Sequence, residues 1–254
     1  MLDFYDMISQ SQQEDKIVEL VRMLYEEKGM TDMIEQACMV AVKRKKPEFC
    51  CELAKILYKE DVMEKLQKVV LDSKNAKICC EFARCVKDAD IKSLQKVVLD
   101  SKELFWCSDF AKYVKGADIK AFQQVVVDSK DPYWCSMFAE EIKGTDIKVL
   151  ENVVIESKDL DCCLSFAKYV KGADIKSLQK VVLERKDPQY CYLFAKDVKD
   201  ANVKALRQVV VDSKNEKLCK EFDKLKDLNK QSLTTKDSSK KVEELEEELK
   251  SWIG

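Results

Sequence analysis

A cysteine recurs every 28 residues through most of this 254-residue chain, and a phenylalanine follows each of these cysteines after three positions. The cysteines are Cys79, Cys107, Cys135, Cys163, Cys191 and Cys219, and the phenylalanines are Phe82, Phe110, Phe138, Phe166, Phe194 and Phe222. The unit reads SKDPYWCSMFAEEIKGTDIKVLENVVIE from residue 129 to residue 156. A fixed period of this length predicts a repeat array, in which each unit buries its apolar face against its neighbours.

Each unit predicts two short helices of about 11 residues. In its first half the apolar residues follow the i, i+3, i+4, i+7 spacing of one helix face, as in Cys135, Phe138, Ala139 and Ile142. The second half has a similar spacing in Ile147, Leu150, Val153 and Val154. Because the chain has only 5 Gly and 3 Pro, it has few tight turns. We therefore expect an all-α fold with essentially no β-structure.

Capping residues occur in phase with the repeat. Asp131–Pro132 and Asp187–Pro188 each predict an N-cap followed by proline in the first helical position, and Pro47 occupies the equivalent place. A left-handed residue is expected after the first helix, at Gly116, Gly144, Gly172 and their replacements Asp88 and Asp200. The predicted caps of the second helix are Asp90, Asp118, Asp146, Asp174 and Asn202.

Stacked helical hairpins of this kind predict an α-solenoid over residues 15–227, with about seven helix pairs and a final single helix. Residues 1–14 contain apolar side chains that could cap the first repeat, and residues 228–240 are polar and predict a linker. Residues 241–254 predict a C-terminal amphipathic helix with a short apolar stripe of Val242, Leu245, Leu249 and Trp252. Such a short helix must dock, either on its own solenoid or on a partner, and could support a weak dimer.

The repeat resembles helical-hairpin arrays such as tetratricopeptide and Sel1-like proteins. Its unit is shorter than the usual tetratricopeptide repeat and lacks that family's Trp-Leu-Gly-Tyr pattern. It also resembles tandem repeats of the form DPxYCxxFAKxVKGADIKxLQxVVxDSK found in microbial and viral proteins, over residues 46–222. These resemblances imply a helical-hairpin fold and no particular activity.

Composition excludes several classes of site. The chain has no histidine, which removes His-based triads and HExxH zinc sites, and its adjacent cysteine pairs lack CxxC spacing. We therefore expect no metal or cofactor, and reduced repeat cysteines buried as small apolar residues.

No apolar run reaches the ~18–20 residues of a membrane span, and residues 1–16 lack the pattern of a secretory signal. We expect a cytoplasmic protein, in a reducing compartment, with no membrane partner.

The leading hypothesis for function is a non-enzymatic scaffold that binds a protein or peptide, as a monomer or a weak dimer. Its acidic residues lie at caps and helix surfaces, and its repeated serines belong to the DSK turn rather than to a nucleophile elbow. An array that binds nucleic acid through lysines is an alternative, although a net charge of -2 and only five arginines weigh against it. A helical-repeat enzyme with a site in its groove is a third.

Aromatic residues give the most local prediction of a partner surface. The slot two residues before the repeated cysteine is polar in most copies, but it holds Phe105 and Tyr133 in two successive ones. Met137 lies one turn after Tyr133 in another mostly polar slot. These three side chains predict an apolar surface patch that binds a partner. The alternative is that tertiary packing covers them.

Lysines also recur every 28 residues. Two rows end the predicted helices and suit their negative ends: Lys74, Lys102, Lys130, Lys158, Lys186 and Lys214, and Lys87, Lys115, Lys143, Lys171 and Lys199. A third row lies near the start of the second helix, where a cation is disfavoured: Lys92, Lys120, Lys148, Lys176 and Lys204. Either this row forms salt bridges to the next aspartate cap, or Lys120, Lys148 and Lys176 face an acidic partner or a phosphate backbone.

Overall fold

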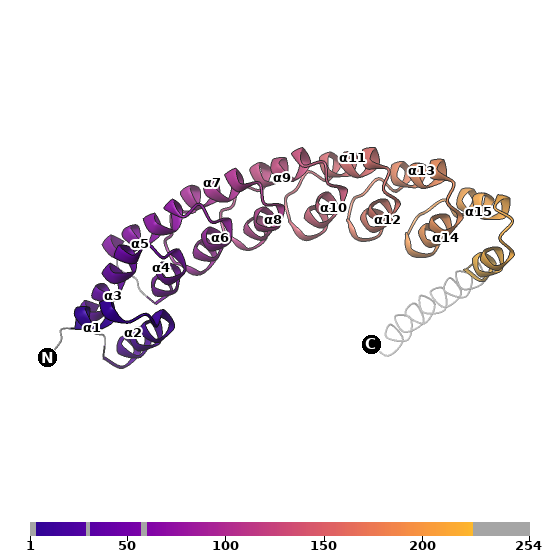
Figure 1. The fold of residues 1–254 in the computed structure, drawn as a ribbon. Helices are drawn as coiled ribbons and strands as arrows, with labels where there is room; N and C mark the ends of the chain where they lie inside the picture. The colour runs from indigo at the N-terminus through magenta and orange to yellow at the C-terminus, as the bar shows by residue number, and fades with distance from the viewer. Residues whose placement is uncertain (1–3, 29–30, 57–59, 226–254) are drawn as a thin grey trace, which may run out of the picture. The chain divides into compact units, whose positions relative to one another are not determined.

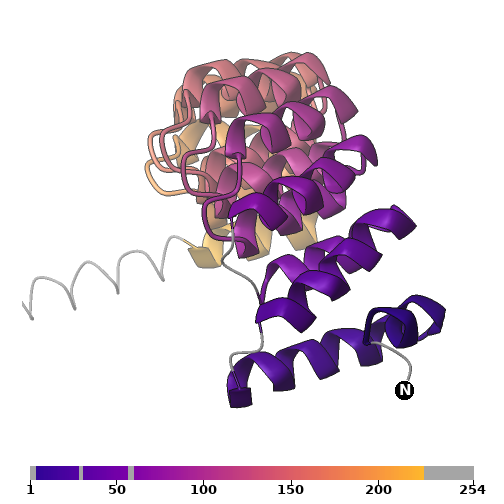
Figure 2. The same cartoon turned by 90° about the vertical axis from the view of Figure 1, so that its left-hand side faces the viewer.

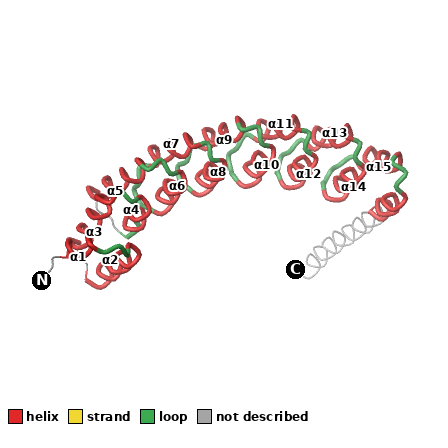
Figure 3. Tube along the Cα trace, viewed as in Figure 1, coloured by secondary structure: helices red, strands yellow, loops and turns green. Residues whose placement is uncertain are grey.

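A computed structural model of the chain describes residues 4–28, 31–56 and 60–225. Among these residues the regular structure is entirely helical, and Figure 3 shows helices joined by loops with no strand. The prediction of an all-α fold is confirmed.

Fifteen helices have both ends within the described ranges. They are α1 (Phe4–Gln10), α2 (Glu14–Lys28), α3 (Thr31–Arg44), α4 (Pro47–Ala54), α5 (Glu60–Asp72), α6 (Ala76–Cys85), α7 (Ile91–Ser101), α8 (Leu104–Tyr113), α9 (Ile119–Asp128), α10 (Pro132–Glu141), α11 (Ile147–Ser157), α12 (Leu160–Tyr169), α13 (Ile175–Arg185), α14 (Pro188–Asp197) and α15 (Val203–Asp212). Residues 216–225 are also helical. From α2 to α15 the helices follow one another with the spacing that the period predicts, and within each unit successive helices contact each other, as α8 and α9 do in one and α12 and α13 in the other. We call the even-numbered members, with helix 216–225, A helices and the odd-numbered members B helices.

The chain forms two compact units, Met1–Asp146 and Ile147–Gly254. In the first unit the helices lie in two layers, with α5, α7 and α9 in one and α4, α6, α8 and α10 in the other (Figures 1 and 2). Helices of one layer contact their neighbours in that layer, as α6 contacts α8 and α7 contacts α9. The second unit shows the same contacts between α12 and α14 and between α11 and α13. Each unit is therefore a stack of helical hairpins.

The repeated residues form the core between the two layers. The phenylalanine of every repeat is fully buried, and so are the cysteines from Cys79 to Cys191. From the B helices, residues such as Leu94 and Val98 are equally buried. The A helices end one residue earlier than the apolar spacing predicts, as α10 shows. Ile142 lies just beyond the end of α10 in extended backbone (φ -109°, ψ 121°), although it remains buried.

Most of the predicted caps are confirmed. Asp131 and Asp187 accept hydrogen bonds from the backbone N–H groups of the first turns of α10 and α14, and all three prolines occupy the first position of a helix. Side chains also cap four B helices as predicted, at Asp90, Asp118, Asp174 and Asn202. The turns after the A helices are left-handed where they were expected to be, at Gly116, Gly144, Gly172, Asp88 and Asp200.

The lysines predicted to end the B helices lie just beyond them instead, in left-handed backbone. Their φ values run from 52° to 57°, at Lys74, Lys102, Lys130, Lys158, Lys186 and Lys214, and Lys45 has a φ of 53°. The preceding serine fixes this turn in most copies. Ser101 Oγ donates to the Val98 carbonyl at 2.7 Å and accepts from the Glu103 N–H at 3.2 Å. The DSK serines therefore join the end of a B helix to the start of the next A helix.

At the start of the chain, α1 packs against α3, with Ile8 buried. Arg44, the last residue of α3, donates from Nη2 to the carbonyl oxygens of Ile8 (2.9 Å), Ser9 (3.3 Å) and Ser11 (2.5 Å). Its Nη1 lies 3.3 Å from Glu14 Oε1. One guanidinium thus holds the end of α1 and the start of α2 against α3.

Candidate interaction surface

Four aromatic side chains gather at the amino-terminal ends of α8 and α10, and we call them the aromatic cluster: Phe105, Trp106, Tyr133 and Trp134. The Phe105 ring lies 4.7 Å from Trp106 and 6.5 Å from Trp134, and the Tyr133 ring lies 5.8 Å from Trp134, as centroid distances. The interplanar angles are 88°, 80° and 79°, so every contact is edge-to-face, a favoured arrangement of aromatic rings. A continuous run of ring contacts therefore connects two successive A helices.

The helical phase of the core determines which cluster members face solvent. Because the cysteine and phenylalanine of each A helix point into the core, the residue two positions before the cysteine points outward. Phe105 is 55% exposed and Tyr133 is 57% exposed, whereas Trp106 and Trp134 are half-buried. Met137, one turn beyond Tyr133, is also half-buried. The interpretation that packing within the described chain covers Phe105 and Tyr133 is therefore wrong.

Local capping fixes the backbone beneath Tyr133 and Trp134. Asp131 Oδ1 accepts from the Tyr133 N–H at 2.9 Å and from the Trp134 N–H at 3.2 Å, and Pro132 occupies the first helical position. Since an N-cap aspartate with a following proline favours one helix start, these two rings are presented from a rigid element.

The third lysine row is exposed along its whole length. Lys92 and Lys120 belong to the first unit, and Lys148, Lys176 and Lys204 to the second. Within the described residues, no ion pair involves Lys92, Lys120, Lys176 or Lys204, so the interpretation as a salt bridge to the next aspartate cap fails for these four. Hydrogen bonds from Ser93 lower the pKa of Asp90, and the charge of Lys92 lowers it further. Lys92 therefore acts on the cap of its own helix.

A glutamine makes the contact to the next cap that the lysines were expected to make. Gln123 Nε2 donates to the Asp146 carbonyl at 3.3 Å, and the Asp146 N–H donates to Gln123 Oε1 at 2.8 Å. Gln67 and Asp90 form the same pair of bonds, as do Gln179 and Asn202. We call this two-point contact the glutamine clamp. The full two-bond contact forms at Gln67, Gln123 and Gln179, whereas Gln95, in the same slot, only accepts a bond from the Asp118 N–H at 2.8 Å. The glutamines of this slot are a sequence signal that the analysis of the sequence missed.

Two further exposed aromatics lie on the A helices and were not predicted. Tyr113 on α8 is 52% exposed and Tyr169 on α12 is 54% exposed. A lysine Nζ lies over each ring, Lys112 at 5.1 Å and Lys168 at 5.0 Å from the centroids. Both lysines also form ion pairs with the next A helix of their own unit, Lys112 with Glu141 (2.9 Å) and Lys168 with Asp197 (3.1 Å). Their common slot follows the lysine near the end of the A helix, which is the signal that could have found them.

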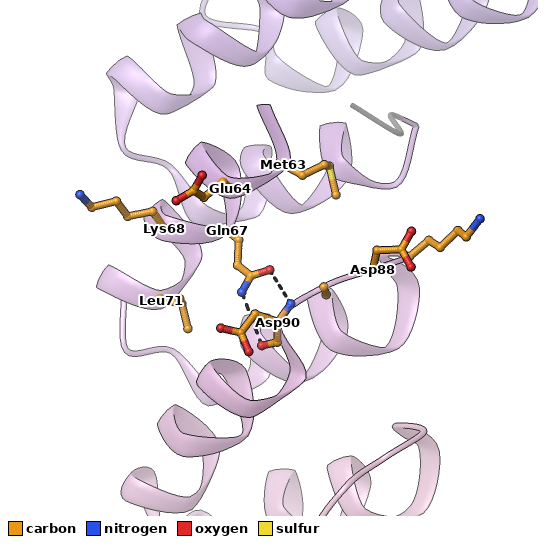
Figure 4. Close-up of a pocket in the computed structure, with 9 residues that line it drawn as sticks. Met63, Glu64, Gln67, Lys68, Leu71, Asp88 and Asp90 are labelled. Carbon is orange, nitrogen blue, oxygen red and sulfur yellow. Dashed lines mark hydrogen bonds between the residues drawn. The ribbon is translucent and has the colours of Figure 1, made fainter. Parts of the chain in front are cut away.

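A hollow of about 730 Å³ lies between α5 and the turn that leads into α7. Met63, Glu64, Lys68 and Leu71 line it from α5. Figure 4 shows the glutamine clamp of Gln67 and Asp90 in its wall. Its lining mixes both signs of charge with apolar groups, and no residue in it is arranged as a nucleophile with an adjacent base.

Nine of the twelve cysteines are buried, whereas Cys85 is exposed and Cys162 and Cys219 are partly exposed. All twelve are free, and burial raises the pKa of Cys79, Cys107, Cys135 and Cys163 to about 12. The repeat cysteine is also a weak hydrogen-bond donor, since Cys107 Sγ lies 3.5 Å from the Val98 carbonyl oxygen. No three acidic or thiol side chains in the described ranges come together as a metal-binding group.

Comparison of the chain with protein-family models, curated proteins and solved structures gives no match. Within residues 4–28, 31–56 and 60–225, no helix combines the length and the apolar character needed to cross a membrane. The predicted linker at 228–240 and the stripe of Val242, Leu245, Leu249 and Trp252 lie outside the described residues.

Proposed function

We propose that this protein is a non-enzymatic scaffold that binds a protein or peptide through the aromatic cluster on α8 and α10. The observation that supports the proposal is the exposure of Phe105 and Tyr133 in a slot that other copies fill with polar residues such as Lys77 and Gln189. The repeat fold does not need aromatic rings there. Trp and Tyr are also enriched among the residues that dominate binding energy at interfaces.

An intracellular, reducing location is part of the same proposal, because the repeat cysteines are packed as free thiols.

The test replaces both exposed rings with residues that this slot already accepts elsewhere. Phe105→Lys with Tyr133→Gln should leave the melting temperature within about 2 °C of the parent, since exposed substitutions usually change stability little. A displayed library of random dodecamer peptides serves as the probe. The parent protein should enrich peptides that the double variant does not bind.

A matched control changes the residues in the same slot on helices outside the cluster, as Lys77→Gln together with Gln189→Lys. This control should select the same peptides as the parent protein. If the parent and the cluster variant select the same peptides, or if the variant loses many degrees of melting temperature, the aromatic cluster is not a partner surface.

Nucleic-acid binding remains the second candidate because the third lysine row is exposed and four of its members have no ion pair within the described residues. Affinity for a single-stranded or duplex oligonucleotide should then fall steeply with salt, because binding releases counterions from the phosphates. Changing Lys120, Lys148 and Lys176 together to Glu should abolish that binding and hold or slightly raise stability, since Glu suits a helix start. Binding with no salt dependence would exclude this candidate.

A further inference from the structure

Two other exposed A-helix tyrosines, Tyr113 and Tyr169, lie close to cations of the same chain. Lys112 and Arg84 lie 5.1 Å and 6.0 Å from the Tyr113 ring centroid, and Lys168 lies 5.0 Å from the Tyr169 centroid. A cation near the face of an aromatic ring is attracted by the negative potential of that face. Tyr113 and Tyr169, the two most exposed tyrosines near the end of an A helix in the described residues, therefore each have a cation of the same unit close to the ring.

The aromatic cluster has no such cation. Within residues 60–225, no lysine or arginine lies over the rings of Phe105, Trp106, Tyr133 or Trp134. The exposed fractions of Phe105 and Tyr133, 55% and 57%, slightly exceed those of Tyr113 and Tyr169, 52% and 54%. These two side chains are thus at least as exposed as the tyrosines beside which the chain places its own cations, and the face of an aromatic ring attracts a cation.

An acidic group stands at the same helix end. Glu103 occupies the N-cap of α8 and makes no capping hydrogen bond, whereas Asn75, Asp131, Asp159 and Asp187 all cap their A helices from this slot. Glu103 is exposed, two residues before Phe105. Lys46, in the same slot of α4, also makes no capping bond, but Glu103 differs from it in keeping an available carboxylate beside the cluster.

The turns that lead into the two cluster helices also carry an excess of negative charge. Asp100 and Glu103 flank Lys102 before α8, and Asp128 and Asp131 flank Lys130 before α10, so each turn has two carboxylates and one ammonium. The corresponding turn before α12 has the same charge, with Glu156, Lys158 and Asp159, whereas the turn before α6 is neutral, with Asp72, Lys74 and Asn75. A partner with a positive charge would complement this end of the surface.

We propose that the aromatic cluster binds a basic side chain, arginine above all, of a partner segment. The planar guanidinium lies against the ring faces of Phe105, Tyr133 and Trp134, and Glu103 serves as its counter-ion. Arginine suits this site better than lysine because its guanidinium is planar, weakly hydrated and able to stack on aromatic rings. The inference depends on the proposed peptide-binding function and specifies the chemistry of its partner.

The test begins with the dodecamer peptides that the parent protein selects and the cluster variant does not. We expect these peptides to share an arginine or lysine. A fluorescein-labelled copy of the tightest binder is then compared with a copy in which citrulline, the neutral isostere, replaces arginine. Fluorescence anisotropy should show that the citrulline copy binds the full-length protein at least about fivefold more weakly, the range expected for a cation–ring contact.

Glu103→Gln should lower the affinity for the arginine peptide by about threefold or more and leave the affinity for the citrulline copy unchanged. Asp159→Asn, the same charge change in the same slot of α12, is the matched control and should change neither affinity. The inference is overturned if the selected peptides are acidic or uncharged, or if the citrulline copy binds equally well. Failure of the proposed function looks different, because the parent and the cluster variant would then select no distinct peptides at all.

Discussion

Glu151 accepts a hydrogen bond of 2.6 Å from the Asp174 backbone N–H, in the slot where Gln123 and Gln179 make the glutamine clamp. Glu151 is buried, and this burial raises the pKa of its carboxyl group. An ionised carboxylate can only accept hydrogen bonds, so it cannot donate to the Asp174 carbonyl as a glutamine amide would. This copy of the clamp therefore has one of its two bonds.

We expect Glu151→Gln to raise the free energy of unfolding by about 1 kcal/mol at neutral pH, because the amide restores the second hydrogen bond. A carboxyl whose pKa is raised in the folded state contributes its stability below the unfolded pKa of about 4.3 and loses it as pH rises through the folded value. The difference in free energy of unfolding between Glu151→Gln and the parent protein should thus grow from about pH 4 upward. Urea unfolding of both proteins between pH 4 and pH 8 measures it.

Gln179→Glu is the matched control. It places a carboxylate in an intact clamp of the same unit and should introduce the same loss of stability as pH rises. If the difference between Glu151→Gln and the parent does not change with pH, Glu151 does not titrate in the way its burial implies.

The repeat fold was predictable because its signals are local. Apolar spacing, the Asp–Pro pairs and the turn glycines act within one helix or turn, and these elements lie where the pattern indicates. Ile142 is an exception to the predicted helix bounds. Its side chain is buried as the apolar spacing predicts, but its backbone is extended and lies one residue beyond the end of α10.

The contacts between repeats were not predictable in the same way. Gln123 pairs with backbone groups of Asp146, 23 residues further along the chain, and backbone groups carry no sequence signature. A lysine near a helix start is electrostatically disfavoured, which predicted a salt bridge to the next cap, but the stacking geometry brings the glutamine amide to that cap instead. Outward orientation of Phe105 and Tyr133 followed from helical phase, whereas the ring contacts through Trp134 depend on how α8 and α10 pack.

Lys102 has a left-handed backbone (φ 55°, ψ 19°) at the end of α7, where glycine is the preferred residue. We expect Lys102→Gly to raise the free energy of unfolding by up to about 1 kcal/mol, because glycine adopts positive φ without a steric cost. Thermal unfolding measures the change. Lys96→Gly, on the exposed face of the same helix, should instead lower stability by about 1 kcal/mol. Equal destabilisation by both changes would contradict the left-handed assignment.

Native-state alkylation should separate the cysteines by burial. Cys85 is exposed, whereas the thiols of Cys79, Cys107 and Cys135 are buried with a pKa of about 12. Because the thiolate is the nucleophile, we expect iodoacetamide at pH 8 to label Cys85 first and to leave these three protected. Mass spectrometry of the digested protein measures the order, and the chain labelled in denaturant provides full reaction as the reference. Rapid native labelling of the three repeat cysteines would contradict their burial.

Arg44 should anchor the first helix. Its guanidinium donates to three carbonyl oxygens at the end of α1 and just after it and pairs with Glu14 at the start of α2, which a single ammonium group cannot reproduce in the same planar geometry. We expect Arg44→Lys to cost about 1.5–3 kcal/mol, the range for hydrogen bonds to a charged group. Hydrogen exchange of the peptide covering α1 should accelerate, while exchange in α8 stays unchanged. Arg22→Lys, on the exposed face of α2, is the matched control and should leave α1 protected. Equal exchange of α1 in both variants would show that packing of Ile8 against α3, rather than the guanidinium, holds this helix in place.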